Sequence, residues 1–244
     1  MSRQIVAIGG AVLVPDSGNR RLERYILAAS GKRHPRVLFV PTASGDESGY
    51  VARFYESYAA LDCTPSHLPF FRRTPPALGE FVLAHDVVHV GGGNTRSMLA
   101  VWRDWGFDDI LRDALGSGVL LCGSSAGSIC WFEEGVTDSV AGNLERMPGL
   151  GFLGGSNCPH YDGEKERRPA YQRMVAAGEI GPGVAADDGV GLHYVDDRLH
   201  AIVTSRPPAR AYRVVRDANG EARETPLDAR ALPEESKDLS RVCE

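Results

Sequence analysis

The stretch "VLLCGSSAGSICWF", residues 119–132, is the part of this chain that most clearly indicates its fold. It opens with four apolar residues, Val119 to Cys122, and such continuous apolar runs are typical of strands buried on both faces of a parallel sheet. Gly-Ser-Ser-Ala-Gly follows at 123–127, and "SICWF" can continue as a helix. The stretch therefore predicts a strand, a sharp turn that carries two serines, and a helix.

Strand and helix patterns alternate on the N-terminal side of this stretch. Apolar strand patterns occur in "RQIVAIGGAVLV", "RVLFVPTAS" and "DVVHVGGGNT", and helical spacing follows each of them. This alternation through the first 130 residues predicts an α/β fold with a doubly wound, mostly parallel sheet flanked by helices.

The pattern is looser after Trp131. Residues 146–169 are rich in glycine, proline and charge and are interpreted mostly as loop, and "PAYQRMVAAG" is interpreted as a helix with proline at its start. Alternation in "GVGLHYVDDRLHAIVTS" and "ARAYRVVRDANGEAR" predicts extra antiparallel strands toward one edge, near the C-terminus. We expect one domain over residues 1–244, with a polar tail from about residue 226.

Composition excludes several classes of function. The 244 residues are 43% hydrophobic and 24% charged, which is ordinary for a globular chain. The net charge of −5 gives no electrostatic basis for binding nucleic acid, and no apolar run approaches the roughly 20 residues of a membrane span. The five scattered cysteines form no C-x-x-C pair, which favours free thiols in a reducing cytoplasm. We expect a cytoplasmic protein that needs no metal and no cofactor.

The glycine-serine turn matches the pattern G-x-S-x-G centred on Ser125. In a nucleophile turn of this kind, the residues two positions away are small because the backbone is crowded there. The hydroxyl then stands at the carboxyl end of the sheet, where backbone N–H groups can stabilise an oxyanion. The alternatives are a structural turn or a phosphate-binding loop. The preceding strand and the following helix favour Ser125 as a nucleophile.

A serine nucleophile needs a base and an acid that orients it. Among the seven histidines, His160 in "NCPHYDGE" is favoured because it lies in a polar loop, where functional residues are common. Asp138 would give the chain order serine, aspartate, histidine of α/β-hydrolases. Asp187 or Asp188, in "VAADDGVG", would give serine, histidine, aspartate, and spacing alone does not choose between the two orders.

A second glycine cluster, "HVGGGNT" at residues 89–95, also lies between a strand and a helix. It lacks the Lys-Ser/Thr ending of a P-loop and the G-x-G-x-x-G spacing of a dinucleotide site. We expect Gly92 or Gly93 to supply a second oxyanion donor beside the N–H of Ala126. Asn94 can hold substrate, or it can cap the following helix.

Four motifs together, "VGGGNT", "CGSSAGS", "NCPHYDGEKERR" and "ADDGVGLHY", resemble the peptidase E (α-aspartyl dipeptidase) family of serine peptidases, to which cyanophycinases are related. The resemblance runs from about residue 5 to residue 215. It implies a class I glutamine-amidotransferase-like fold with serine in place of the amidotransferase cysteine. It also implies Ser125 as nucleophile, His160 as base and Asp188 as acid, with Asp187 the near rival and Asp138 less favoured.

The family's activity is hydrolysis of dipeptides with N-terminal aspartate, and reading that side chain requires a cation. Arginine suits the task through its bidentate fork. The resemblance assigns this role to Arg168, with Arg167 beside it, although both also fit the solvated start of a helix. The prediction is thus a serine peptidase that acts on small peptides, as a monomer or homodimer.

Three alternatives stay open. One is a cyanophycinase-like hydrolase of β-aspartyl-arginine peptides. Another is a non-catalytic amidotransferase-like binding protein, against which the presence of both Ser125 and His160 argues. The third is an esterase of the α/β-hydrolase type that uses Asp138, and it would lose activity on Asp138→Asn while keeping it on Asp188→Asn.

Overall fold

The computed structural model describes residues 2–13 and 18–234, and its centre is an eight-stranded sheet with the order β14-β11-β10-β1-β5-β4-β2-β3. The five parallel strands are β1 (Gln4–Ile8), β5 (Leu120–Ser124), β4 (Val87–Val90), β2 (Arg36–Val40) and β3 (Thr64–His67). Strands β5 and β4 are buried along their whole length, which explains their continuous apolar sequence. The sheet is extended by antiparallel β10 (Val190–Val195) and β11 (Arg198–Thr204), and then by the short β14 (Arg230–Ala231).

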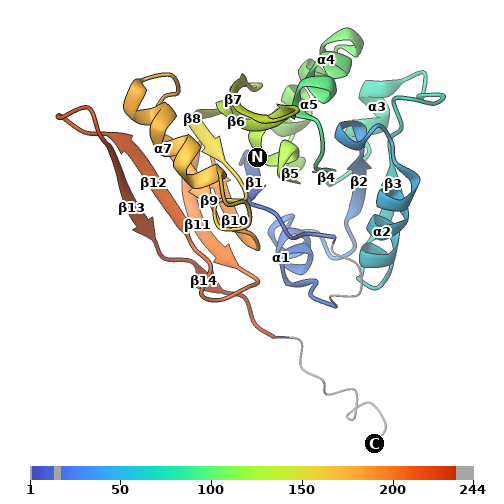
Figure 1. The fold of residues 1–244 in the computed structure, drawn as a ribbon. Coiled ribbons are helices and arrows are strands. Elements are labelled where there is room, and N and C mark those ends of the chain that lie inside the picture. The colour runs from blue at the N-terminus through green and yellow to red at the C-terminus, as the bar shows by residue number, and fades with distance from the viewer. Residues whose placement is uncertain (1, 14–17, 235–244) are drawn as a thin grey trace, which may run out of the picture.

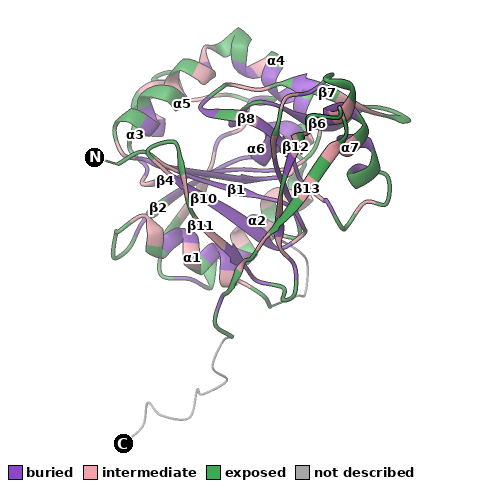
Figure 2. Ribbon diagram, turned by 90° about the vertical axis from the view of Figure 1, so that its left-hand side faces the viewer, coloured by how far each residue is buried: buried purple, intermediate pink, exposed green. Residues whose placement is uncertain are grey.

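Helices cover both faces of this sheet, as Figure 2 shows with the sheet seen close to edge-on. One face packs against α1 (Arg21–Ala29) and α2 (Ser48–Ala59). The other face packs against α3 (Leu78–Leu83), α4 (Thr95–Trp105) and α5 (Phe107–Gly116). The predicted doubly wound, mostly parallel α/β architecture is therefore confirmed.

A second sheet, which the sequence did not reveal, packs beside α4 and α5 (Figure 1). Its order is β13-β12-β9-β8-β6-β7, formed by β6 (Phe132–Val140), β7 (Asn143–Pro148), β8 (Leu153–Cys158), β9 (Gly183–Ala186), β12 (Ala211–Arg216) and β13 (Ala222–Leu227). Alternate residues of β9 face opposite ways, so Val184 and Ala186 join the main core while Ala185 contributes to a separate cluster with α7 (Arg167–Ala177). Helix α7 thus covers the outer face of this sheet.

Several expectations for the C-terminal half need correction. The helix after the serine turn is the single turn α6 (Ala126–Ile129), and the chain enters β6 at Phe132. Residues 146–169 contain strand β8 and the end of β7 rather than mostly loop. The sequence obscured β6 because it carries acidic residues. One of them, Glu134, is buried where it pairs with Arg146 on β7 and accepts the Gly181 N–H at 2.6 Å.

The two predicted C-terminal hairpins do form, as β10–β11 and β12–β13, but only the first belongs to the main sheet. The predicted helix at "PAYQRMVAAG" corresponds to α7. Strand β13 continues to Leu227 and β14 follows it, so ordered structure extends beyond the predicted start of the tail at about residue 226.

No helix within residues 2–13 and 18–234 has the length and apolarity needed to cross a membrane. The four cysteines in this part of the chain are buried free thiols, at positions 63, 122, 130 and 158. Burial raises the pKa of the Cys122 and Cys130 thiols well above the ordinary value, so these thiols stay protonated. The expectation for the fifth cysteine, Cys243, lies outside the described residues.

Candidate active site

Ser125 occupies a strained turn between β5 and α6. Its φ of 57° and ψ of −114° lie outside the regions that L-residues favour, and such strain is concentrated at functional sites. The Ser125 carbonyl accepts the N–H groups of Ser128 at 2.9 Å and Ile129 at 3.0 Å, which starts the short helix. Ser124 is 4% exposed, whereas Ser125 is only partly buried. The turn therefore leaves Ser125 partly accessible to solvent and buries Ser124.

Glycines make this turn sterically feasible. A methyl group at Gly123 would lie 2.7 Å from the Gly127 carbonyl carbon and 2.8 Å from the Val90 oxygen. A methyl group at Gly127 would lie 2.9 Å from the Val90 carbonyl carbon. These obstacles are backbone atoms that cannot move aside, so the small residues expected at both ends of G-x-S-x-G are required by packing.

The end of β1 anchors three parts of the site in succession. The Ile8 carbonyl accepts the Ser125 N–H at 3.2 Å, and the Gly9 carbonyl accepts the His160 N–H at 3.0 Å. The Gly10 carbonyl accepts the Gly189 N–H at 2.9 Å, directly after Asp188. Three consecutive residues thus bring together segments that are far apart in the sequence. In the sequence, these glycines appear only as part of the apolar stretch "RQIVAIGGAVLV".

His160 and Asp188 form a hydrogen-bonded pair. His160 Nδ1 lies 2.7 Å from Asp188 Oδ1, and the two side chains are 21% and 25% exposed. The pKa of Asp188 is held below its ordinary value, first by this hydrogen bond and then by the charges of His160, Arg206 and Arg167. The carboxylate is therefore ionised near neutral pH and can stabilise a protonated imidazole. His160 itself has a positive φ of 54°, so its backbone is also constrained.

The other two candidate acids have different partners. Asp187 Oδ2 accepts the N–H of Arg210, the residue before β12, at 3.0 Å, and burial raises the pKa of its carboxyl. Asp138 on β6 is largely exposed and forms an ion pair with Arg167 at 3.6 Å. Of the three aspartates, Asp188 is the one that contacts His160. In the described part of the chain, no group of three histidine, cysteine or acidic side chains is placed to hold a metal ion.

The candidate oxyanion donors lie on two sides of Ser125. A methyl group at Gly92 would be 3.2 Å from Ser125 Cβ, so the glycine loop after β4 adjoins the serine. The Gly92 N–H donates to the Tyr50 hydroxyl at 3.1 Å, a contact that the sequence did not indicate. Among the described residues, no hydrogen bond is made by the N–H of Ala126 or of Gly93. Of the predicted oxyanion donors, these two N–H groups are therefore the ones without an acceptor among the described residues.

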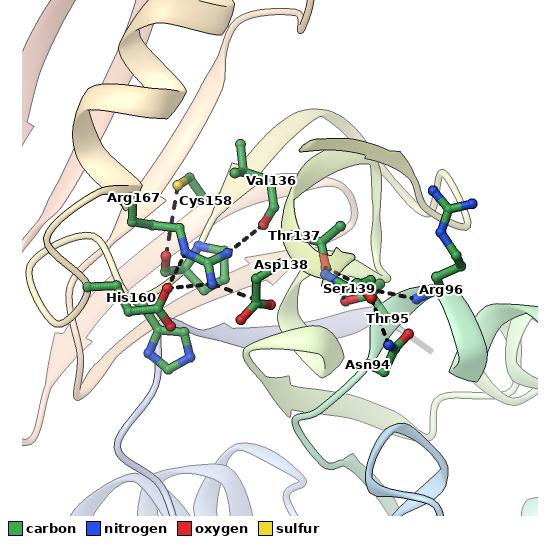
Figure 3. A network of polar contacts seen from close by, with 12 residues as sticks. Asn94, Thr95, Arg96, Val136, Thr137, Asp138, Ser139, Cys158, His160 and Arg167 are labelled. Atoms are coloured by element: carbon green, nitrogen blue, oxygen red, sulfur yellow. Dashed lines mark hydrogen bonds and ion pairs between the residues drawn. The ribbon is translucent and has the colours of Figure 1, made fainter. Parts of the chain in front are cut away.

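Asn94 serves as the cap of α4 and also bonds to β6. Its Oδ1 accepts the Ser97 N–H at 2.9 Å, and its Nδ2 donates to the Ser139 carbonyl at 3.0 Å. Figure 3 shows this cluster, in which Ser139 also accepts the Arg96 N–H at 3.1 Å. Both ends of the Asn94 amide are thus engaged, which matches the capping alternative rather than a substrate contact.

Arg167 and Arg168 point to different surroundings. Arg167 is 1% exposed, donates to the Val136 carbonyl at 2.9 Å and pairs with Glu164 at 2.7 Å. Figure 3 shows it between the His160 segment and Asp138. Arg168 pairs with Glu224, and its guanidinium also lies over an aromatic ring, 4.9 Å from the Tyr212 ring centre. Arg168 therefore belongs to the surface formed by α7, β12 and β13.

Comparison with known proteins identifies the class of protein. The model for Peptidase family S51 matches residues 5–202, which is most of the chain. The chain therefore belongs to this family of serine peptidases, and the resemblance to the peptidase E family is confirmed.

Individual relatives agree with this assignment. The chain is 50% identical over 230 residues to the uncharacterized peptidase YgaJ of Bacillus subtilis (strain 168), covering 94% of this chain and 99% of YgaJ. A crystal structure of a peptidase from an acI-B1 Actinobacterium superposes with a TM-score of 0.69, at 16% identity, over 93% of this chain and 94% of the other. A Listeria monocytogenes EGD-e protein assigned as a peptidase E gives a TM-score of 0.61, at 17% identity, over 84% and 99%. At these identities the two structures show a shared fold.

Proposed function

We propose that this peptidase cleaves short peptides, preferentially dipeptides with N-terminal aspartate, through Ser125, His160 and Asp188. The observation that carries the proposal is the anchoring of all three segments by Ile8, Gly9 and Gly10 at the end of β1. A strained serine turn, a histidine and an ionised carboxylate converge there, which is the arrangement that activates a hydroxyl nucleophile.

In the first step, the Ser125 oxygen attacks the scissile carbonyl carbon while His160 Nε2 takes the hydroxyl proton. Asp188 holds the Nδ1–H of the ring and stabilises the imidazolium that forms. Among the described contacts, no hydrogen bond joins Ser125 Oγ to His160. Catalytic hydrogen bonds are often long in the absence of substrate and shorten in the substrate complex.

The tetrahedral oxyanion is bound by the N–H groups of Ala126 and Gly93. Neither N–H donates to an acceptor among the described residues, whereas the Gly92 N–H already bonds the Tyr50 hydroxyl. His160 then protonates the leaving amine, and the C–N bond breaks to give an acyl-Ser125 ester. Water, deprotonated by His160, attacks this ester and releases the acid product.

The preference for aspartate rests on membership of the family and needs a cation in the site. Arg168 is the residue that the sequence assigned to this task. Its guanidinium is neutralised by Glu224, which also accepts hydrogen bonds from Tyr161 at 2.6 Å and from Gln172 at 2.9 Å. We therefore expect Arg168→Gln to leave the ratio of kcat/KM for Asp-X over Ala-X nearly unchanged. A collapse of that ratio would assign aspartate recognition to Arg168 after all.

The test is hydrolysis of a panel of Asp-X, Glu-X, Ala-X and β-Asp-Arg dipeptides by the wild type and by Ser125→Ala. We expect turnover of Asp-X that is lost in the variant. Preferential turnover of β-Asp-Arg would replace the proposed substrate with a cyanophycin-like one and retain the mechanism. No turnover by folded wild-type protein would refute the proposed substrate class.

A further inference from the structure

Asp162 and Arg206 hydrogen-bond to the backbone of the candidate acid, Asp188, one at its N–H and the other at its carbonyl. The Asp188 N–H donates to Asp162 Oδ1 at 2.8 Å. The Arg206 Nε donates to the Asp188 carbonyl at 3.1 Å. Arg206 Nη2 and Asp162 Oδ2 form an ion pair that closes the ring. One carboxylate and one guanidinium thus hold the backbone of Asp188 at both its donor and its acceptor, and we call this pair the Asp188 clamp.

The clamp joins the two halves of the histidine–carboxylate pair. Asp162 lies two residues after His160 in the same loop, and Arg206 follows β11. The hydrogen bond and the ion pair of Asp162 thus tie the His160 loop to the backbone that carries Asp188. The same loop also passes close to the Asp188 side chain, since a methyl group at Gly163 would lie 2.9 Å from its Cγ.

The solvent exposure of Arg206 and Asp162 indicates that their ion pair positions Asp188 rather than stabilises the fold. The side chains of Arg206 and Asp162 are 48% and 36% exposed, and ion pairs this open to water contribute little to folding. The guanidinium fork is rigid and planar, so it fixes geometry even where it adds little stability. Removing the Arg206 guanidinium should leave the protein folded, while the backbone of Asp188 becomes free to move.

We propose that Asp162 and Arg206 are positioning residues that keep Asp188 in register with His160 for the reaction at Ser125. The proposal rests on the proposed function of the triad. Neither residue touches the reacting atoms. Each acts through the backbone of Asp188, so its loss should lower kcat and leave substrate binding largely intact.

The test compares Arg206→Gln, Arg206→Lys and Asp162→Ala with the wild type. Misplacing a catalytic group by about 1 Å costs on the order of 100-fold in rate, so we expect kcat to fall by about 10- to 100-fold in Arg206→Gln and Asp162→Ala. KM should stay within about twofold, because the lost interaction is not with substrate. Arg206→Lys keeps the charge and should recover part of the rate. The double variant Asp162→Ala/Arg206→Gln should be no slower than the worse single variant, since both side chains hold the backbone of one residue and also pair with each other.

The matched control is Arg3→Gln, which breaks an ion pair with Asp197 whose side chains are each 47% exposed. This variant should keep the wild-type kcat. Hydrogen exchange at the Asp188 amide and the NMR signal of the His160 Nδ1 proton report on the clamp without any substrate. We expect Arg206→Gln to speed that exchange and to weaken that signal.

Failure of the positioning proposal can be told apart from failure of the proposed function. If Ser125→Ala abolishes turnover while Arg206→Gln and Asp162→Ala keep the wild-type kcat, the triad stands and the positioning proposal is overturned. If the wild type hydrolyses nothing on the panel, the proposed substrate class fails. The clamp is then decided by the Nδ1 signal, whose loss in Arg206→Gln supports it and whose persistence, with unchanged amide exchange, overturns it.

Discussion

Replacing Gly10 by alanine perturbs the candidate active site with one carbon atom. The added methyl group would lie 2.5 Å from His160 Nδ1 and closer still to Asp188 Oδ1, whereas ordinary contact begins near 3.4 Å. The backbone at Gly10 does not have the positive φ that would itself exclude alanine. The obstacles are the ends of two side chains, which can rotate toward solvent. The protein should therefore fold, with the pair displaced.

The size of the effect follows from this geometry. The pair must move by about 1 Å, and a displacement of that size costs on the order of 100-fold in kcat. The largest expected loss in kcat is about 10⁴-fold, which is the effect of removing the orienting acid altogether. In free energy of activation this range is about 3 to 5 kcal/mol. The melting temperature should stay close to that of the wild type, because no backbone atom is among the three nearest obstacles to the methyl group.

The assay is kcat on the fastest dipeptide of the panel, together with thermal unfolding. Gly116→Ala is the matched control, because a methyl group there meets nothing within 4 Å and Gly116 lies at the exposed end of α5. It should keep full activity and gain roughly 0.5 to 1 kcal/mol of stability. Activity of Gly10→Ala within about twofold of the wild type would refute the claim that Gly10 seats the histidine–carboxylate pair.

Three further predictions concern strain, the acid and pH. Ser125→Gly should abolish activity and raise the free energy of unfolding by about 1 kcal/mol in denaturant titrations, because glycine relieves the strained φ; an unchanged or lower value would contradict this. Asp188→Asn should lower kcat by about 10³- to 10⁴-fold while Asp138→Asn stays near wild type, and the reverse order would favour the hydrolase-type alternative. Burial lowers the pKa of His89 from 6.5 to about 4, so the unfolded chain binds a proton that the folded chain excludes. The free energy of unfolding should thus fall by up to about 3 kcal/mol from pH 6.5 to 4, and His89→Gln should flatten that slope in urea titrations.

The sequence predicted the parts of the fold where local pattern and burial agree. Strand β5 is central and parallel, so its residues are all apolar or small and its turn residues follow a known steric rule. The sequence predicted the β12–β13 hairpin but not the rest of the second sheet, because some of its other strands lack the apolar or alternating pattern of a strand. Strand β8 has the sequence LGGSNC, and its Asn157 is fully buried because its amide donates to the Val184 carbonyl at 3.2 Å. Tertiary hydrogen bonds, which the sequence does not display, make such strands stable.

The sequence predicted those site residues whose side chains are themselves reactive or titratable. A serine in G-x-S-x-G and a histidine in a polar loop are visible in the sequence. The contacts of Gly10, Asp162 and Arg206 are not, because they depend on how β1, the His160 loop and the segment after β11 meet in space. The "IGG" sequence after the first strand was the available signal for the β1 anchor. Its meaning depends on which N–H groups those carbonyls accept.

The most direct test of the central claim is covalent labelling of the folded protein with a serine-reactive phosphonate, mapped by mass spectrometry with fragmentation between Ser124 and Ser125. We expect a single adduct on Ser125, which is absent from Ser125→Ala and forms more slowly in Asp188→Asn. No adduct, or an adduct on another residue, would contradict the assignment of Ser125 as the nucleophile.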